Sequence, residues 1–487
     1  MGEILGHLKP ALVWNHFEEI CKYPRPSKKE EKIAGYILSV GKRLGLQTER
    51  DKFGNILIRK PATPGMENRK TVTLQSHIDM VCEKNRDVEH DFDNDPIQPY
   101  IDGEWVKAKG TTLGADNGIG VAAALAVLES NDIEHGPIEA LFTLDEETGL
   151  TGASSLKKGW LKGDILINMD SEELGTLYIG CAGGKNTQAK FKFKPEKSPR
   201  NYVAFEAKVA GLKGGHSGLE IHVGRGNAIK ILNRLLWTYS QEKKLRVAKI
   251  EGGNKHNAIP REAFAVVLVP KADEKKFKKF VAEYNATVKD EFATIEPDLS
   301  VSVEKHQMPD KVMDEKTQSK LLNALYAVPH GVIKMSPDIP ELVETSTNLA
   351  TIITDGKYVN IVTSQRSSVA SEIKDITNMV SAVFQLAGAE LNYGDGYPGW
   401  KPDIHSEILQ VFKSTFANMY GKEPEVKAIH AGLECGIIKE KYPQMDMISF
   451  GPTMFGVHSP DERLKIDTVP EFWNQLVNVL KNIPVKS

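Results

Sequence analysis

The sequence predicts an α/β protein in which one domain is interrupted by an inserted α+β domain. Short apolar runs alternate with helical patterns in the first third of the chain, a charged and proline-containing stretch occupies residues 191–201, and the α/β texture returns after the Gly/Pro-rich segment 393–403. We therefore expect an interrupted domain of residues 1–186 and 400–487 and an insert of residues 187–399. The 487 residues allow this division, because a domain averages roughly 150 residues.

The interrupted domain is expected to hold a mixed sheet with flanking helices. The first twenty residues have the pattern of an amphipathic helix, and three apolar runs that end in polar residues indicate buried strands: TVTLQSH at 71–77, IEALFTLDEE at 138–147 and DILINMD at 164–170. A helix rich in Ala and Leu is expected over 118–130. After the insert we expect a helix over 405–420, strands over 425–429 and within 444–452, and a helix over 469–482.

The insert is expected to consist of two tandem α+β halves. The first half reads as strand, helix, two strands, helix and strand, over 202–210, 226–241, near 248, 263–269, 274–292 and near 300. The second half reads as a helix over 319–327, a hairpin over 349–363 that turns at Thr354-Asp355-Gly356, a helix over 371–386 and a strand over 390–393. The sequence shows no strong residue-level repeat between the halves.

The composition excludes several classes of protein. Sixty-two Lys and Arg against 65 Asp and Glu give a net charge of −3, without the basic excess of a nucleic-acid binder. No apolar run approaches the ~18 to 20 residues of a membrane span, and the N-terminus has no signal-peptide pattern. The cysteines are few, scattered and without a CxxC motif, so a Cys-rich zinc module is excluded and a cytoplasmic protein is expected: Cys21, Cys82, Cys181 and Cys435.

Acidic and histidine side chains follow three of the predicted strands. His77 and Asp79 follow the first, Glu146 and Glu147 the second, and Asp170 the third. Because ligands of open α/β sheets bind outside the carboxyl ends of the strands, these side chains are expected to converge on one crevice. Carboxylates gathered there repel one another unless cations neutralise them. The sequence therefore favours a metal site.

Each of these residues also has a structural interpretation when taken alone. His77 fits a hydrogen-bonded histidine at a strand end, and Asp116 in GADNG fits a turn former or helix N-cap. The Glu146-Glu147 pair fits a solvated loop. Imidazole and carboxylate donors together match zinc or a similar divalent ion, and a bridging carboxylate between two such ions is typical of hydrolases. The motifs HExxH, Walker loop and GxSxG are absent.

The motifs resemble those of a known enzyme family. SHIDMVCE, GTTLGADNGIGVAAALAVLE, FTLDEETGLTGA and LINMDSEE resemble the co-catalytic zinc exopeptidases of the aminoacylase and carboxypeptidase type. GGHSG, GGNKHNAIP, ETSTNLA, RSSVASE, HAGLECG and GPTMFGVHSPDE make the resemblance closer to the aminoacyl-histidine dipeptidase (peptidase D) branch. The resemblance covers nearly the whole chain. It implies a zinc-exopeptidase-like catalytic domain with an inserted lid domain.

The resemblance also implies roles around the two zinc ions. Asp116 would bridge the metals, and its peptide bond to Asn117 is expected to be cis. One metal would be completed by His77 and Asp170, and the other by Glu147 and His458, although a histidine in FGVHSPDE would otherwise be taken for a loop residue. Manganese and cobalt suit the same ligands.

Two further acidic residues would act beside the metals. Glu146 would be the general base for the attacking water, and it would pass the proton to the leaving amine. Asp79, two residues after His77, would orient that imidazole. Period-two spacing on an extended segment places both of these side chains on one face.

Four residues would handle the substrate. His216 in GGHSG would polarise the scissile carbonyl, while Asn257 in HNAIP and Arg366 in QRSS would bind the substrate backbone and carboxylate. Their structural alternatives are a Gly-rich turn, a turn-capping Asn and a surface Arg. Glu434 in HAGLECG would meet the substrate α-ammonium group.

These roles describe a metal-dependent dipeptidase for unblocked dipeptides, preferably with C-terminal histidine. Lid closure would complete the site. A broader di- or tripeptidase, an N-acyl amino acid deacylase and a non-catalytic peptide-binding protein are the alternatives. The expected partner is a small dipeptide, with no nucleic acid or membrane, and the sequence leaves monomer and homodimer both open.

Overall fold

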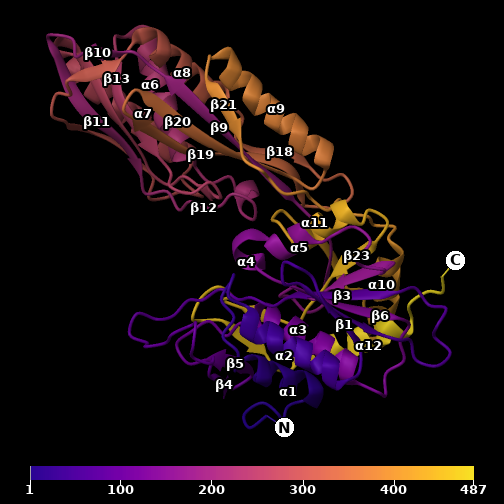
Figure 1. The fold of residues 1–487 in the computed structure, drawn as a ribbon. Helices are drawn as coiled ribbons and strands as arrows, with labels where there is room; N and C mark the ends of the chain where they lie inside the picture. The colour runs from indigo at the N-terminus through magenta and orange to yellow at the C-terminus, as the bar shows by residue number, and fades with distance from the viewer. Residues whose placement is uncertain (1, 487) are drawn as a thin grey trace. The chain divides into compact units, whose positions relative to one another are not determined.

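The chain folds into two compact units. The computed structural model describes residues 2–486. One unit comprises Met1–Cys181, Trp400–Ala428 and Leu433–Ser487, and the other comprises Ala182–Gly399 and Ile429–Gly432. In Figure 1 the first unit accordingly contains both the indigo and the yellow ends of the chain, whereas the second runs from magenta to orange. The fold is mixed α/β, as the sequence predicts.

The division differs in detail from the expected boundaries. The expected limit at residue 186 falls inside β9 (Gly183–Lys192), which pairs with β20 (Tyr358–Ser367) from its first residue onward. Because β9 pairs with β20 along its whole length, the second unit begins before β9, at Ala182. A four-residue return, Ile429–Gly432, also belongs to the second unit, although the sequence assigned it to the first.

The first unit is built on an eight-stranded sheet in the order β1-β2-β6-β3-β7-β23-β8-β22. The neighbours β6, β3, β7 and β23 are parallel, and their carboxyl ends therefore meet along one edge. Every residue of β3, β6 and β7 is buried, as expected for strands covered on both faces. The strands are β1 Gln47–Arg50, β2 Ile56–Lys60, β3 Val72–His77, β6 Ile138–Thr143, β7 Ile165–Asn168, β8 Thr176–Cys181, β22 Glu425–Ile429 and β23 Asp446–Ser449.

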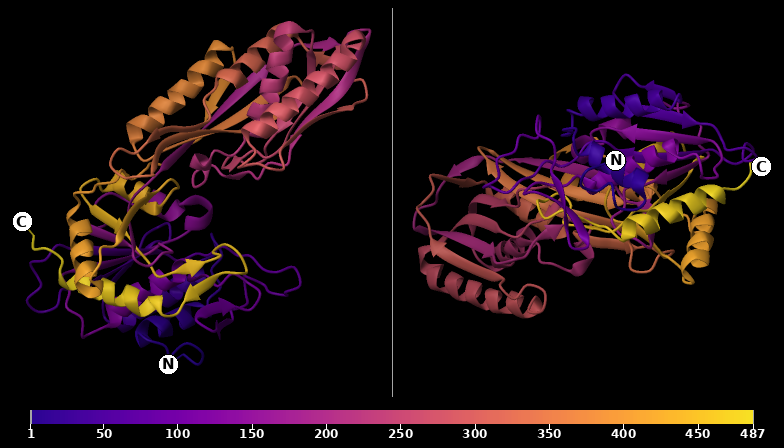
Figure 2. Two further views of the ribbon diagram at one scale, coloured as in Figure 1. Left: turned by 180° about the vertical axis from the view of Figure 1, so that it is seen from behind. Right: turned by 90° about the horizontal axis from the view of Figure 1, so that it is seen from below.

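Helices and a small second sheet complete the first unit. The predicted amphipathic N-terminal helix is α1, which buries Val13, Trp14 and Phe17. The helix α3 begins at Ala115, three residues before the predicted start, and is buried almost all round. Figure 2 shows the indigo N-terminal and yellow C-terminal helices of this unit from two further sides. The helices are α1 Ala11–Ile20, α2 Glu31–Arg43, α3 Ala115–Glu129, α4 Glu146–Gly149, α5 Thr151–Ser155, α10 Glu407–Tyr420, α11 Glu434–Lys441 and α12 Thr468–Lys481; the small sheet is β24 Met454–Phe455, β25 Arg463–Lys465, β5 Trp105–Ala108 and β4 Pro99–Asp102.

The second unit is built on one nine-stranded sheet rather than two separate halves. The order is β16-β11-β15-β13-β19-β20-β9-β21, with β18 also paired to β19. The strands of the two expected halves join where β13 meets β19, through the pairs Glu251↔Ile353 and Gly252↔Ile352. The remaining strands are β11 Tyr202–Ala210, β13 Arg246–Gly252, β15 Ala263–Pro270, β16 Ser300–Lys305, β18 Gly331–Met335, β19 Val343–Asp355 and β21 Glu390–Tyr393.

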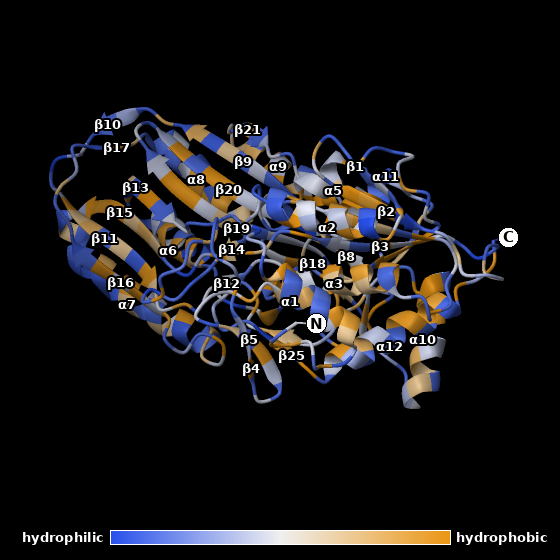
Figure 3. Ribbon diagram, turned by 60° about the horizontal axis from the view of Figure 1, so that its bottom comes forward, coloured by the Kyte–Doolittle hydropathy of each residue, from blue (hydrophilic) through white to orange (hydrophobic). Residues whose placement is uncertain are grey.

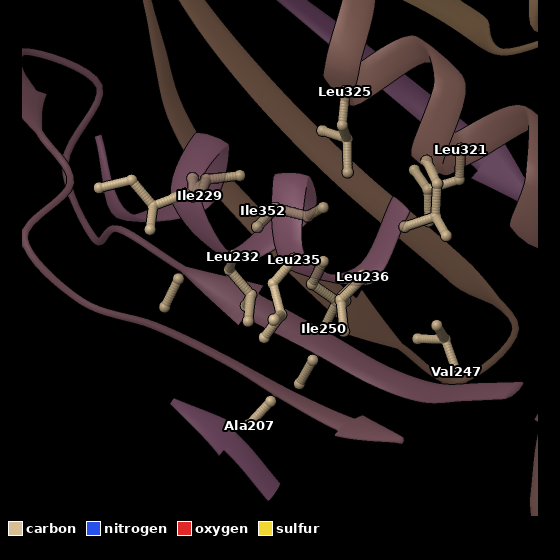
Figure 4. Packing of buried hydrophobic residues seen from close by; sticks show 14 of the residues in the cluster. Ala207, Ile229, Leu232, Leu235, Leu236, Val247, Ile250, Leu321, Leu325 and Ile352 are labelled. Carbon is tan, nitrogen blue, oxygen red and sulfur yellow. The ribbon is translucent and has the colours of Figure 1, made fainter. Parts of the chain in front are cut away.

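Four helices bury the apolar side of this sheet: α6 Ala228–Glu242, α7 Glu274–Glu291, α8 Glu315–Ala327 and α9 Ala370–Leu386. Leu232, Leu235 and Leu236 of α6 lie with Val247 and Ile250 of β13 in one cluster (Figure 4). Blue and orange alternate along the strands in Figure 3, because one face packs on helices and the other is solvated.

Within residues 2–486, no helix combines the length and apolar character that a membrane span requires.

Candidate active site

The candidate metal ligands lie at the ends of the parallel strands. His77 is the last residue of β3, Asp170 lies two residues beyond β7, and Glu147 is the second residue of α4, which follows β6 closely. Asp116 lies in the first turn of α3 with non-helical backbone angles, and the Asp116-Asn117 peptide is cis, as the resemblance implies. Parallel strand ends thus bring together residues that are far apart in sequence.

Two groups of potential metal donors share Asp116. His77, Asp116 and Asp170 offer donor atoms within 4.8 Å of one another, and so do Asp116, Glu147 and His458. His77 Nε2 lies 3.0 Å from Asp116 Oδ1 and 3.3 Å from Asp170 Oδ1. His458 Nε2 lies 3.1 Å from Asp116 Oδ2 and 3.1 Å from Glu147. Each oxygen of Asp116 therefore faces a different group.

Glu146 lies in a third such group, with His77 and Glu147. Burial raises the pKa of Glu146 well above its usual range. Proximity alone therefore leaves two roles for Glu146, a metal ligand or a proton acceptor.

Asp79 does more than the sequence indicates. Its Oδ1 lies 3.2 Å from His77 Nδ1, which is an ion-pair distance although the geometry does not satisfy a hydrogen bond. Its carboxylate also accepts the backbone N–H groups of Glu146 (3.0 Å) and Glu147 (3.2 Å) and the Ser27 hydroxyl (2.8 Å). Asp79 therefore fixes the start of α4 as well as lying against the imidazole.

The electrostatics of this cluster favour bound cations. Hydrogen bonds to Asp116 and Glu147 raise the pKa of His458 to about 11. Burial, together with the charges of Asp116 and Glu147, raises the pKa of Asp170 to about 7. The carboxylates outnumber the imidazoles, so the cluster keeps protons unless another positive charge is present.

Two buried residues that the sequence did not single out hold the loop that carries Asp116. The Glu462 carboxylate accepts backbone N–H groups of the loop, at 2.7 Å from Leu113, 2.9 Å from Gly114, 2.7 Å from Ala115 and 3.3 Å from Asp116. The Arg25 guanidinium donates to backbone carbonyls of Ile78, Asp79 and Gly114, at 3.3, 3.0 and 2.5 Å. The loop is therefore held through four of its N–H groups and through the Gly114 carbonyl, and Arg25 also links it to the segment that follows β3.

Glu434 begins α11 and is completely buried in the first unit. Its Oε2 accepts hydrogen bonds from Gln75 Nε2 (2.6 Å) and Thr143 Oγ1 (2.7 Å). Its Oε1 has no hydrogen-bond partner. Burial raises the pKa of Glu434 to about 7, and the charges of Asp170 and Asp79 act in the same direction.

The other predicted substrate residues lie in the second unit. The pairing of β12 (Gly215–His216) with β14 (Ala258–Ile259) brings His216 beside Asn257, and both residues line a cavity of about 730 Å³. His216 Nδ1 accepts the N–H groups of Gly218 (3.2 Å) and Leu219 (3.0 Å). Burial and the charge of Arg366 lower the pKa of His216. The ring is therefore neutral, with its remaining N–H on Nε2.

Arg366 is buried in the second unit and only partly satisfied. It donates from Nη1 to the Tyr397 hydroxyl (3.0 Å), and its Nε has no partner. Gly218 marks a small space between three groups. A side chain there would clash, because its Cβ would lie 2.2 Å from the His430 carbonyl oxygen, 3.1 Å from His216 Cε1 and 3.3 Å from Arg366 Cζ. This arrangement contradicts the alternative of a surface arginine.

His430 is a buried neighbour that the sequence did not predict. Its Nε2 lies 2.7 Å from Ser346 Oγ, and its Nδ1 is buried without a partner. Burial and the charges of Arg366 and His216 lower the pKa of His430 to about 3. The only signal in the sequence was its place as the first residue of the HAGLECG motif, since residues far apart in the chain supply its surroundings.

Comparison with known proteins identifies the family. Residues 73–482 match the model of peptidase family M20/M25/M40. The chain belongs to this family. It is therefore a peptidase, and its closer relatives agree with that assignment.

Two relatives match almost the full chain. The chain is 46% identical over 482 residues, 99% of each protein, to the cytosol non-specific dipeptidase of Escherichia coli K12. It matches the crystal structure of aminoacylhistidine dipeptidase from Vibrio alginolyticus with a TM-score of 0.94 and 49% identity over 99% of both chains. Aminopeptidase PepT of Bacillus cereus shares the fold, with a TM-score of 0.58 and 16% identity over 98% of this chain and 99% of that one.

The donor chemistry of this M20 peptidase fits divalent metals. Zinc and similar ions accept imidazole nitrogen and carboxylate oxygen, and the two groups around Asp116 offer both. Asp79 lies behind His77 as carboxylates do behind metal-binding imidazoles. The residues present therefore suit one metal in each group.

Proposed function

We propose that this M20 peptidase is a dipeptidase that works with two divalent metal ions and prefers unblocked Xaa-His dipeptides. One observation carries the proposal: Asp116 contributes one oxygen to each of two adjacent donor groups. In this proposal His77 and Asp170 hold one ion, and Glu147 and His458 hold the other. Zinc is the proposed metal, with manganese and cobalt as alternatives.

The ions and the protein would divide the chemistry. When bound, two such ions polarise the scissile carbonyl and lower the pKa of a shared water. Glu146 would take a proton from the attacking water and give it to the leaving amine, a role that suits a buried carboxyl of raised pKa. His216 would donate a hydrogen bond from its Nε2–H to the developing oxyanion, because its Nδ1 is already an acceptor.

The substrate would be recognised at both termini. Arg366, with its unpaired Nε, and Asn257 would bind the carboxylate end. Glu434 would bind the α-ammonium group through its free Oε1. The preference for C-terminal histidine is proposed from the similarity to the Vibrio aminoacylhistidine dipeptidase, and a cytoplasmic setting from the similarity to the cytosol dipeptidase of Escherichia coli.

Metal removal and replacement tests this function. The protein is dialysed against a chelator and assayed with Ala-His and with N-acetyl-alanine before and after addition of zinc, manganese or cobalt. We expect hydrolysis of Ala-His to disappear with the metal and to return with about two ions per chain. Hydrolysis of the acetylated compound alone would refute the dipeptidase proposal.

A broader dipeptidase is the second candidate, favoured by the words "non-specific dipeptidase" in the name of one full-length relative. The two candidates differ in the residue at the C-terminal position of the substrate. A panel of Ala-Xaa dipeptides separates them. Equal kcat/KM values for histidine and for aliphatic residues would favour the broader activity.

A further inference from the structure

A row of buried polar side chains crosses the central sheet of the first unit. Gln75 of β3, Asn168 of β7 and Ser449 of β23 are register partners on adjacent parallel strands, and all three are fully buried. Such strands are normally apolar, because a buried polar group is costly unless it is hydrogen-bonded. We call these three residues, together with Ser171, the polar row.

The hydrogen bonds of the polar row run in one direction and end on Glu434. Ser449 donates to Asn168 Oδ1 (2.5 Å), and Asn168 donates to Gln75 Oε1 (2.6 Å). Gln75 then donates to Glu434 Oε2 (2.6 Å). Ser171 Oγ lies 2.7 Å from Ser449 Oγ. Because the Ser449 hydroxyl already donates its hydrogen to Asn168, Ser171 is the donor in the bond between the two serines.

The arrangement suits a carboxylate that is ready to bind a cation. Gln75 and Thr143 both donate to Oε2 of Glu434, which favours the ionised form. Chains of hydrogen bonds strengthen one another when all of their dipoles align. The other oxygen, Oε1, is buried and has no partner. With a pKa of about 7, Glu434 is partly ionised at neutral pH, and a cationic donor at its free oxygen completes the ionised form.

We propose that the polar row and Thr143 position Glu434 so that its Oε1 receives the α-ammonium group of the substrate. The inference rests on the proposed dipeptidase function, which assigns Glu434 to the amino terminus, and adds the residues that hold this carboxylate in position. An α-amino group has a pKa of about 7.7–8.0, so it is mostly an ammonium at neutral pH. An acylated amine carries no charge and leaves the buried carboxylate uncompensated.

A matched pair of substrates tests the proposal. Ala-His and propionyl-His differ only in that hydrogen replaces the α-ammonium group. In Gln75→Met the side chain keeps its length and loses its donor. We expect kcat/KM for Ala-His to fall by about 10- to 100-fold, which corresponds to the free energy of one hydrogen bond to a charged group. The kcat/KM for propionyl-His should change little.

The controls separate positioning from general damage. Gln444→Met makes the same replacement at an exposed site of the first unit and should leave both substrates unchanged. Asn168→Leu and Ser449→Ala should lower the preference for Ala-His less than Gln75→Met does, because they act through more bonds. Metal content should stay at the wild-type value in every variant. Where propionyl-His turns over too slowly, its inhibition constant against Ala-His replaces kcat/KM.

An equal loss for both substrates in Gln75→Met, or no loss for either, would overturn the inference. If Gln75→Met does not fold, Thr143→Val decides in the same assay, because it removes the other donor to Glu434. The proposed function fails separately if the wild-type protein does not cleave Ala-His, and this inference then falls with it. Cleavage of Ala-His with an unchanged substrate ratio in the variants overturns this inference alone.

Discussion

The two units of the chain hold binding groups of opposite charge. In the first unit, carboxylates outnumber imidazoles around Asp116 at the ends of parallel strands. In the second unit, the buried Arg366 guanidinium, the neutral His216 ring and the His430 carbonyl oxygen surround the space at Gly218. The carboxylates around Asp116 lack a balancing positive charge, and the Arg366 guanidinium lacks a balancing anion. Each site therefore indicates its ligand by the charge that it leaves unbalanced.

The largest expected effect separates two adjacent residues of the acidic group. Glu146→Gln should lower kcat by about 10²- to 10⁴-fold and leave the metal content intact, because only the proton acceptor is lost. Glu147→Gln should lower the metal content itself. Metal analysis beside steady-state kinetics checks both variants, and metal loss in Glu146→Gln would instead make Glu146 a ligand.

The basic group should respond to the charge of the substrate. Arg366→Met should raise KM for Ala-His by about 10- to 100-fold, because a charged hydrogen bond to the carboxylate is lost. The amide of Ala-His should be affected much less. Arg200→Met, at an exposed position of the same unit, serves as the control. An equal change for dipeptide and amide would show that Arg366 does not bind the carboxylate.

The loop that carries Asp116 should affect how tightly the acidic group binds metal. Glu462→Gln removes the charge that holds four backbone N–H groups before and at Asp116, and we expect metal affinity to fall by about 10- to 100-fold, as for other supporting residues of metal sites. Competition with a chromogenic chelator measures this affinity. Glu440→Gln is the exposed control, and an unchanged affinity in Glu462→Gln would remove Glu462 from the support of the site.

The smallest effect concerns the stability of the second unit at low pH. Burial lowers the pKa of His330 to about 3, so the folded protein binds this proton less readily than the unfolded chain does. The resulting stability is complete above the ordinary histidine pKa of about 6.5 and is lost as the pH falls from there towards 3, at up to about 1.4 kcal/mol per pH unit. His330→Asn should flatten this part of the curve. Urea unfolding at several pH values measures the slope, and an unchanged slope would contradict the assignment.

The sequence predicts the residues whose signal is local. His77 and Asp170 could be found because each ends an apolar run, and strand ends of a parallel sheet converge. The resemblance to a zinc-exopeptidase family was needed for His458, because a histidine in a loop carries no local signal. The fold class follows from the same apolar runs.

The sequence does not predict residues that act on distant backbone groups. Glu462 accepts N–H groups of a loop that lies 346 to 349 positions earlier in the chain. Arg25 likewise contacts only carbonyls, which have no signature in the side-chain pattern. The predicted limit at residue 186 is displaced for a similar reason, since β9 joins the second unit through hydrogen bonds to β20, whereas the limit between 399 and 400 agrees with the structure.

Asp79 shows how little freedom one position can have. The same carboxylate touches an imidazole, caps a short helix and accepts a serine hydroxyl. A substitution there alters three contacts in one step, so no gradual series of variants leads away from aspartate. A directed-evolution library aimed at new substrates should therefore keep codon 79 fixed and place its diversity in the second unit.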